Sequence, residues 1–170
     1  MARKSLLTQQ IENEQTIVVL IGPTAAGKTD AAMKLQDHLG GQFAAQLISA
    51  DSAMIYKGMD IGTAKPSTEE LAAYPHELVS ILDAKEIYSA ADFVRDADTC
   101  IVDAFAQKKT PIIVGGTMLY VKCFLQGIAK LPDADEATRS QLVKELELRG
   151  GKALHDELAA IDPAAAANIH

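Results

Sequence analysis

Hydrophobic residues along this chain form short continuous runs that alternate with longer stretches in which they recur every three or four positions. The first run, residues 16–21, is apolar, β-branched and followed by glycine, which is typical of a strand buried on both faces of a parallel sheet. Residues 28–39 then show helical spacing, and Gly40-Gly41 ends the pattern. The beginning of the chain therefore predicts a strand, a glycine-rich loop and a helix.

The same alternation continues through the next hundred residues. Strands are predicted at 46–50, 78–82 and 111–114, and helices at 90–107 and 118–126, with a long loop at 56–74 that holds one helical turn near 68–73. Asp51 and Asp83 directly follow two of these strands. We expect an α/β fold, namely a P-loop NTPase-like parallel sheet with helices on both faces and its ligands at the carboxyl ends of the strands.

Beyond Gly127 the pattern becomes purely helical. A helix is predicted from Leu131-Pro-Asp to Gly150-Gly151, a second from 152 to 161, and an alanine-rich segment after Asp162-Pro163. We divide the chain into a flexible lead-in at 1–14, a P-loop α/β core at 15–128 and the start of a helical insertion, or arm, at 129–170.

Composition and charge narrow the classes of function. Hydrophobic residues make up 48% of the 170 positions, which excludes wholesale disorder, and no apolar run approaches the about 20 residues that cross a bilayer. The N-terminus shows no secretory signal, so a cytoplasmic protein without a membrane partner is expected. The net charge of −7, taken alone, argues against nucleic acid, although the acidic surplus is concentrated in residues 51–100.

A phosphate-binding motif lies between the first strand and the first helix. The segment Gly22-Pro-Thr-Ala-Ala-Gly-Lys-Thr29 matches G-x-x-x-x-G-K-[ST] in full. Its backbone N–H groups and the helix N-terminus would face phosphate oxygens, and the Thr29 hydroxyl would ligate Mg²⁺. The motif indicates a di- or triphosphate and does not specify ATP. We therefore predict that the diphosphate of a substrate or nucleotide binds to Gly22, Pro23, Thr24, Ala25, Ala26, Gly27, Lys28 and Thr29.

Two further groups of residues are predicted at the same edge of the sheet. Asp51 ends a strand that we expect to lie next to the first strand. It is a candidate general base for an acceptor amine or hydroxyl, with a helix cap or an outer magnesium ligand as alternatives. The turn Gly115-Gly116-Thr117 begins a helix and either holds a second anion or is simply a tight turn. The four histidines show no spacing typical of a metal site, and we assign them to the surface or to packing: His38, His76, His155 and His170.

Five segments taken together closely resemble the bacterial tRNA dimethylallyltransferase, or tRNA isopentenyltransferase, family. They are Gly22-Pro-Thr-Ala-Ala-Gly-Lys-Thr29, Ile48-Ser-Ala-Asp-Ser52, Ile55-Tyr-Lys-Gly-Met-Asp-Ile-Gly-Thr-Ala-Lys-Pro66, Tyr88-Ser-Ala-Ala-Asp-Phe93 and Val114-Gly-Gly-Thr-Met-Leu-Tyr120. The resemblance implies transfer of a dimethylallyl group from dimethylallyl diphosphate to N6 of adenosine 37 in tRNAs that read codons starting with U.

The resemblance also implies roles for individual residues. Asp51 resembles the general base, and Thr117 is the second catalytic candidate. The P-loop would hold the donor diphosphate, with Thr29 and Mg²⁺ neutralising the leaving group. The residues that resemble tRNA-binding positions, including those around a flipped-out adenine, are Asp51, Ser52, Ala53, Met54, Thr117 and Arg139.

The expected partners are therefore dimethylallyl diphosphate and the tRNA anticodon stem-loop, bound by a monomer. Family members are considerably longer, so we expect these 170 residues to keep the diphosphate site and to have little or no transferase activity alone. Three alternatives stay open: a small-molecule or nucleotide kinase using ATP, a free-adenylate isopentenyltransferase, and a phosphate-binding remnant without catalysis. The kinase is weakened by the scarcity of arginine, which is limited to Arg3, Arg95, Arg139 and Arg149.

Overall fold

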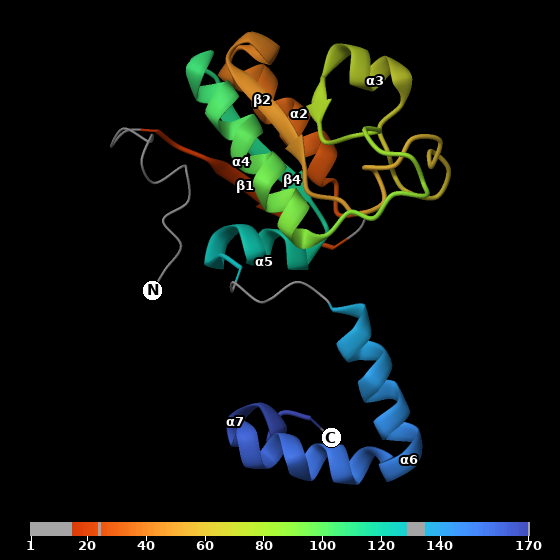
Figure 1. Ribbon diagram of the computed structural model, residues 1–170. Coiled ribbons are helices and arrows are strands. Elements are labelled where there is room, and N and C mark those ends of the chain that lie inside the picture. Colours follow the sequence, from red (N-terminus) through yellow and green to blue (C-terminus); the bar gives the residue numbers. More distant parts are fainter. Residues whose placement is uncertain (1–14, 24, 129–134, 170) are drawn as a thin grey trace. The chain divides into compact units, whose positions relative to one another are not determined.

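The structure is a computed structural model that describes residues 15–23, 25–128 and 135–169. It divides into two compact units, Met1–Ile128 and Ala129–His170. The first unit contains a sheet with helices against its faces, and the second is helical in its described part (Figure 1). No described helix has the length and the apolar character needed to span a membrane.

A four-stranded parallel sheet forms the centre of the first unit. Its strands are β1 (Val18–Ile21), β2 (Ala45–Ser49), β3 (His76–Glu77) and β4 (Thr110–Gly115), in the order β1-β4-β2-β3. Val114 of β4 is opposite Leu20 of β1 on one side and Ser49 of β2 on the other. The carboxyl ends of these three strands therefore reach the same edge of the sheet, where parallel α/β folds bind ligands.

Helices cover both faces of this sheet (Figure 1). On one face, Ala32 and Met33 of α2 (Lys28–Leu39) pack in a core with Leu47 and Ile112. On the other face, α4 (Ala90–Ala106) and α5 (Met118–Gln126) pack against Ile48 and Ile113 through the buried side chains Phe93, Val94, Ala97, Ile101, Tyr120 and Val121. Burying the apolar residues of both faces is the main force that holds the three layers together. The predicted α/β fold is confirmed.

Helix starts follow the local sequence closely. α4 begins with a capping box in which Ser89 Oγ accepts from the Asp92 N–H and the Asp92 carboxylate accepts from the Ser89 N–H. The short helix α3 (Thr68–Ala73) has the same arrangement between Ser67 and Glu70. The predicted helical turn at 68–73 and the predicted helices at 90–107 and 118–126 are thus present, and a 3₁₀ turn, η1 (Gly41–Phe43), follows α2.

The third predicted strand is misplaced. The structure has a strand of two residues at His76–Glu77, whereas Leu78 and Ser80 adopt left-handed backbone angles with φ of 62° and 53°. Such angles interrupt an extended strand. Instead, the N–H groups of Ser80 and Ile81 donate to the carbonyls of Met54 and Ile55. The apolar run 78–82 therefore joins the long loop and not the sheet.

Two expectations about β1 are also corrected. β4 lies between β1 and β2, so the strand that leads to Asp51 is not the neighbour of the P-loop strand. Within the described residues β1 is at the edge of the sheet; its residues 18–20 are only half-buried, and Ile21 is 49% exposed. The apolar run alone did not distinguish this position from a central one, because both favour β-branched residues.

The described part of the second unit contains α6 (Glu136–Ile161) and α7 (Pro163–Ala166). Gly150, with φ of 79° and ψ of 160°, breaks α6 into two helices, as the glycine pair predicted. Asp135 caps the start of α6, while residues 131–134, where the sequence predicted the helix start, lie outside the described residues. Asp162 caps α7, and Ala166 O accepts a hydrogen bond of 3.1 Å from His155 Nε2 when that nitrogen is protonated.

Candidate active site

A cavity of about 400 Å³ opens at the carboxyl edge of the sheet. One side is formed by the P-loop and the first turns of α2, and another by the ends of β2 and β4. The long loop at 63–66, together with Glu70 and His76, completes the lining. Segments separated by many residues in the sequence thus surround one space, which is the usual position of a ligand site in a parallel sheet.

The P-loop presents its motif residues to this cavity. Gly27, with φ of 72°, is the N-cap of α2, and Ala25 also has a left-handed φ of 63°. Lys28 Nζ donates to the carbonyl of Pro23 across the loop at 2.6 Å. The motif residues that line the cavity are Ala25, Gly27, Lys28 and Thr29. Gly22, Pro23 and Ala26 belong to the same loop without lining the cavity, and Thr24 lies outside the described residues.

Asp51 faces the same cavity from the end of β2. Its Oδ1 accepts hydrogen bonds from the N–H groups of Ala53 at 2.9 Å and Met54 at 3.3 Å, which is an Asx turn that fixes the carboxylate. Met54 lines the cavity beside it. The half-buried Asp51 is therefore fixed by the turn that follows it, and it lines the same cavity as the P-loop.

The turn after β4 is tied to the residues after β2. Thr117 Oγ1 accepts from the Ser52 N–H at 2.9 Å and donates to Ser52 Oγ at 3.2 Å. A Cβ on Gly115 would lie 2.2 Å from the carbonyl oxygen of Ala50, so only glycine permits this approach. Gly115 and Gly116 line the cavity, whereas Ser52, Ala53 and Thr117 do not line it and are bonded within the turns next to it.

The structure adds cavity residues that were not assigned to a site from the sequence. Lys65 lines the cavity, and its Nζ donates to Tyr56 O, Asp60 Oδ1 and Ser80 Oγ at 2.7, 2.8 and 3.0 Å. The only signal for Lys65 was its place in the family-specific run 55–66. The run 55–66 placed Lys65 within the family pattern, but the neighbouring residues did not predict where the Lys65 side chain lies.

His76 lines the cavity as well, whereas the sequence assigned it to the surface or to packing. The structure places its Nδ1 2.7 Å from the carbonyl of Tyr74, so the neutral ring with a proton on Nδ1 donates this bond. Its Nε2 is buried and has no hydrogen-bond partner among the described residues. Burial lowers the pKa of His76 below its ordinary value, more than the bond to Tyr74 and the charge of Glu70 raise it.

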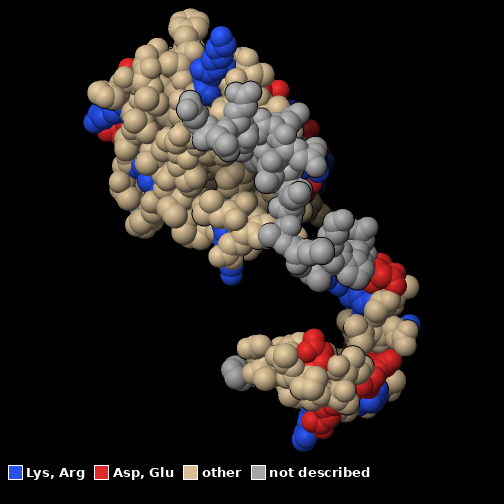
Figure 2. All heavy atoms as spheres, turned by 90° about the vertical axis from the view of Figure 1, so that its left-hand side faces the viewer, with Lys and Arg blue, Asp and Glu red and all other residues tan. Residues whose placement is uncertain are grey.

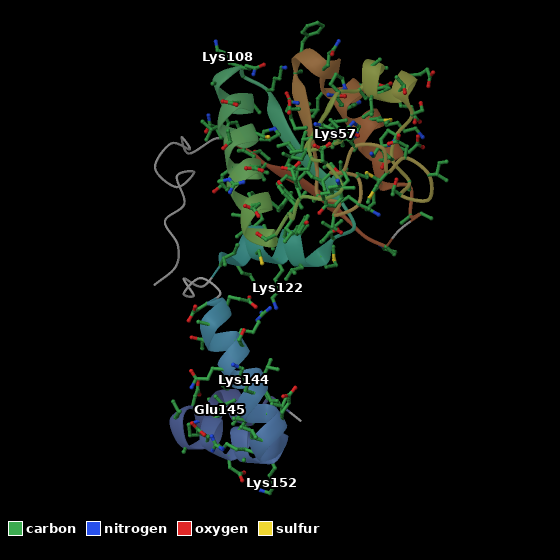
Figure 3. The ribbon with its side chains drawn as sticks, turned by 45° about the vertical axis from the view of Figure 1, so that its right-hand side comes forward. Lys57, Lys108, Lys122, Lys144, Glu145 and Lys152 are labelled. Carbon is green, nitrogen blue, oxygen red and sulfur yellow. The ribbon has the colours of Figure 1, made fainter. Side chains whose placement is uncertain are left out.

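Arg139 belongs to the second unit, where it is exposed in the first turns of α6. Positive and negative side chains are mixed over the described part of that unit (Figure 2). In the first unit, Lys57 lies in the long loop, Lys108 in the turn that follows α4, and Lys122 in α5. Lys108 and Lys122 are near opposite ends of the layer formed by α4 and α5 (Figure 3). The labelled lysines of the first unit therefore do not form one basic patch.

Comparisons with known proteins identify the family of the chain. A model of the family "IPP transferase" matches residues 54–170. A tRNA dimethylallyltransferase of Chromohalobacter salexigens is 54% identical over 153 residues, which are 90% of this chain and 48% of that protein. The chain belongs to the IPP transferase family.

Solved structures of the family have the same fold. The full-length tRNA isopentenylpyrophosphate transferase of Bacillus halodurans is 40% identical, with a TM-score of 0.64 over 92% of this chain and 51% of that one. A eukaryotic dimethylallyltransferase acting on tRNA is 28% identical, with a TM-score of 0.73 over 92% of this chain and 38% of that one. The chain thus spans about half the length of the curated relative and of the bacterial structure that it matches.

Proposed function

We propose that this chain is the donor-binding part of a tRNA dimethylallyltransferase. The reaction moves a dimethylallyl group from dimethylallyl diphosphate to N6 of adenosine 37 in tRNAs that read codons starting with U, in the cytoplasm. The observation that carries the proposal is that P-loop residues Lys28 and Thr29 and the carboxylate of Asp51 line one cavity, in a chain of the IPP transferase family.

The P-loop end of the cavity suits the diphosphate of the donor. Backbone N–H groups at the start of α2 and the positive end of its helix dipole attract phosphate oxygens. Lys28, whose ammonium already reaches across the loop to Pro23, supplies a mobile positive charge at the same place. The remaining P-loop residues, including Thr24, are assigned to this diphosphate site because they belong to the same sequence motif.

The residues around the cradle fit a magnesium ion. Thr29 and Asp51 line the cavity, and hard oxygen ligands such as a hydroxyl and a carboxylate, with substrate phosphates and water, are those Mg²⁺ prefers. When bound, Mg²⁺ would neutralise charge on the diphosphate. We assign Thr29 to this ion, while Asp51 is held by Ala53 and Met54 for another task.

Asp51 is placed to act as general base. As N6 attacks the first carbon of the allyl group, an N–C bond forms, the C–O bond to diphosphate breaks and a proton leaves N6 for the Asp51 carboxylate. Asp51 Oδ1 is used by the Asx turn, so Oδ2 is the oxygen that we assign to the proton. The leaving diphosphate stays at the P-loop, and Thr117 fixes the Asp51 segment through Ser52.

The acceptor side is proposed to be tRNA. A base must leave its stack before a catalyst reaches N6, so residues 51–54 and Thr117 would surround an extruded adenine next to Asp51. Arg139 would contact the anticodon stem-loop from the second unit. A free-adenylate isopentenyltransferase remains the second candidate within this chemistry, but the curated relative and the eukaryotic structure are both named for tRNA.

A kinase is disfavoured by the charges at the cavity. Arginines that close over a transferred phosphoryl group are typical of kinases. Among the described residues of the first unit, Arg95 is the one arginine; it is paired with Asp92 and Asp96 and does not line the cavity.

A thermal-shift comparison tests the proposal on this chain. Dimethylallyl diphosphate with Mg²⁺ should raise the melting temperature more than ATP with Mg²⁺ at equal concentration, because a ligand that binds only the folded state stabilises it. Inorganic diphosphate is the control for the P-loop alone. A larger shift with ATP would contradict the transferase and support the kinase.

A further inference from the structure

Lys65 has a nearly buried charge that the proposed reaction does not use. Its side chain is only 3% exposed, and its ammonium makes an ion pair with Asp60, whose side chain is 65% exposed. Burying an ammonium is costly unless its N–H groups are satisfied. All three donors of Lys65 have acceptors, on Tyr56, Asp60 and Ser80, so this charge is held in one position.

These acceptors belong to segments that have to be held together. Ala64 and Ser80 both adopt left-handed angles, with φ of 55° and 53°, which are unfavourable for residues with a side chain. Ser80 is also joined to the Asp51 turn, because its N–H donates to Met54 O at 2.9 Å. Lys65 therefore connects the strained loop at 63–66 with Ser80, and through Ser80 with the turn that holds Asp51.

The loop held by Lys65 forms one wall of the cavity. Thr63, Ala64, Lys65 and Pro66 all line it, and Pro66 is buried. The apolar parts of this wall and of Met54 differ from the polar P-loop side, where the diphosphate would bind. A donor anchored by its diphosphate would then have its hydrocarbon tail against the apolar wall.

We propose that Lys65 is a positioning residue that fixes the 63–66 wall against the Asp51 turn and thereby determines how well the cavity accepts the hydrocarbon tail of a prenyl diphosphate. Lys65 does not touch the reacting atoms in this proposal. It acts through the loop and through Ser80. The part that concerns the tail rests on the proposed function, whereas the part that concerns the wall does not.

Hydrogen exchange on the ligand-free 170-residue chain tests the wall. In Lys65→Met the amides of Ser80 and Ile81, which donate to Met54 and Ile55, should exchange about tenfold faster or more, because local opening no longer breaks a buried charge network. Lys57→Met is the matched control, since Lys57 lies in the same loop with an exposed side chain and loses the same charge (Figure 3). Unchanged exchange in Lys65→Met would overturn the proposal.

A milder variant covers the case in which Lys65→Met does not fold, as judged by circular dichroism. Ser80→Ala removes one acceptor and leaves the Lys65 charge paired with Asp60. It should speed exchange at Ile81 in the same direction by a smaller factor. Exchange equal to that of the unchanged chain would contradict the link through Ser80.

Binding of two ligands tests the role in specificity. Lys65→Met should lower the affinity of the chain for dimethylallyl diphosphate by about tenfold, the size of effect expected when an apolar pocket loses one well-placed contact. Inorganic diphosphate, which needs only the P-loop, should bind as before. Equal weakening of both ligands would mean that Lys65 merely supports the fold, and would overturn its role in specificity.

The same titrations separate this inference from the proposed function. If the unchanged chain binds dimethylallyl diphosphate no more tightly than inorganic diphosphate, the proposed donor is wrong. The proposed contact between the wall and the hydrocarbon tail of that donor is then wrong as well. The exchange experiment would then decide by itself whether Lys65 fixes the wall. Faster exchange supports that statement and unchanged exchange refutes it.

Discussion

Ser52 and Thr117 are 65 positions apart in the sequence and hydrogen-bonded at the carboxyl edge of the sheet, where the Ser52 N–H donates to Thr117 Oγ1 at 2.9 Å. This bond joins the turn after β2, which begins with Asp51, to the turn after β4. Both turns sit at the end of a strand whose backbone the sheet already fixes. The candidate base is thus positioned by rigid elements, which favours precise catalysis over mobility.

Asp51→Asn should abolish most of the transfer while keeping the donor site. Asparagine retains the Oδ1 acceptor for Ala53 and Met54 but cannot take a proton, so turnover should fall roughly 10²- to 10⁴-fold. The assay uses this chain joined to the remaining half of the Chromohalobacter salexigens relative, with tRNA and dimethylallyl diphosphate. Asp83→Asn, at an exposed carboxylate, is the control. Loss of donor binding in Asp51→Asn would assign Asp51 to the metal or to the fold.

Lys28→Ala should lower the affinity of the chain for inorganic diphosphate by roughly 10- to 100-fold, the loss expected for a hydrogen bond to a charged group. Isothermal titration of the 170-residue chain with Mg²⁺ present measures it. Lys34→Ala removes the same charge from α2, where Lys34 is exposed and paired with Asp30, and should change little. Similar losses in both variants would show that the effect is one of overall charge.

Gly115→Ala should lower the free energy of unfolding of the first unit by roughly 1–3 kcal/mol or more, because the new Cβ would meet the Ala50 carbonyl oxygen at 2.2 Å. Urea unfolding followed by circular dichroism measures the change. Gly151→Ala is the control: its Cβ would find Leu146 at 3.8 Å beside the break at Gly150, so alanine should change the free energy of unfolding by less than about 0.5 kcal/mol. A neutral Gly115→Ala would mean that the two turns separate easily.

His76 should make the fold less stable in acid. Burial lowers its folded pKa below the ordinary value of 6.5, so below that pH the unfolded chain binds a proton that the folded chain resists. The free energy of unfolding should therefore fall as the pH drops from 7.5 through 6.5, and less so in His76→Gln. His38→Gln, at an exposed histidine, should follow the unchanged chain. Parallel pH curves for His76→Gln and the unchanged chain would contradict a buried neutral imidazole.

The sequence determined the features that consecutive residues create by themselves. The P-loop between a strand and a helix, the helix over 90–107 and the break at Gly150 were all predicted, because each depends on local backbone geometry and on hydrogen bonds within a few positions. Their places after two predicted strands also made Asp51 and the Thr117 turn candidates, and the family resemblance added specific roles for both residues. Their predicted roles remain proposals.

Tertiary structure alone decided how these pieces meet. The strand order, with β4 between β1 and β2, depends on which apolar faces pack together, and the run at 78–82 left the sheet because its amides found partners on Met54 and Ile55. The same holds for Lys65 and His76, whose environments are built by segments distant in the sequence. Local propensity does not predict such contacts, because the burial and the partners of a side chain depend on the whole fold.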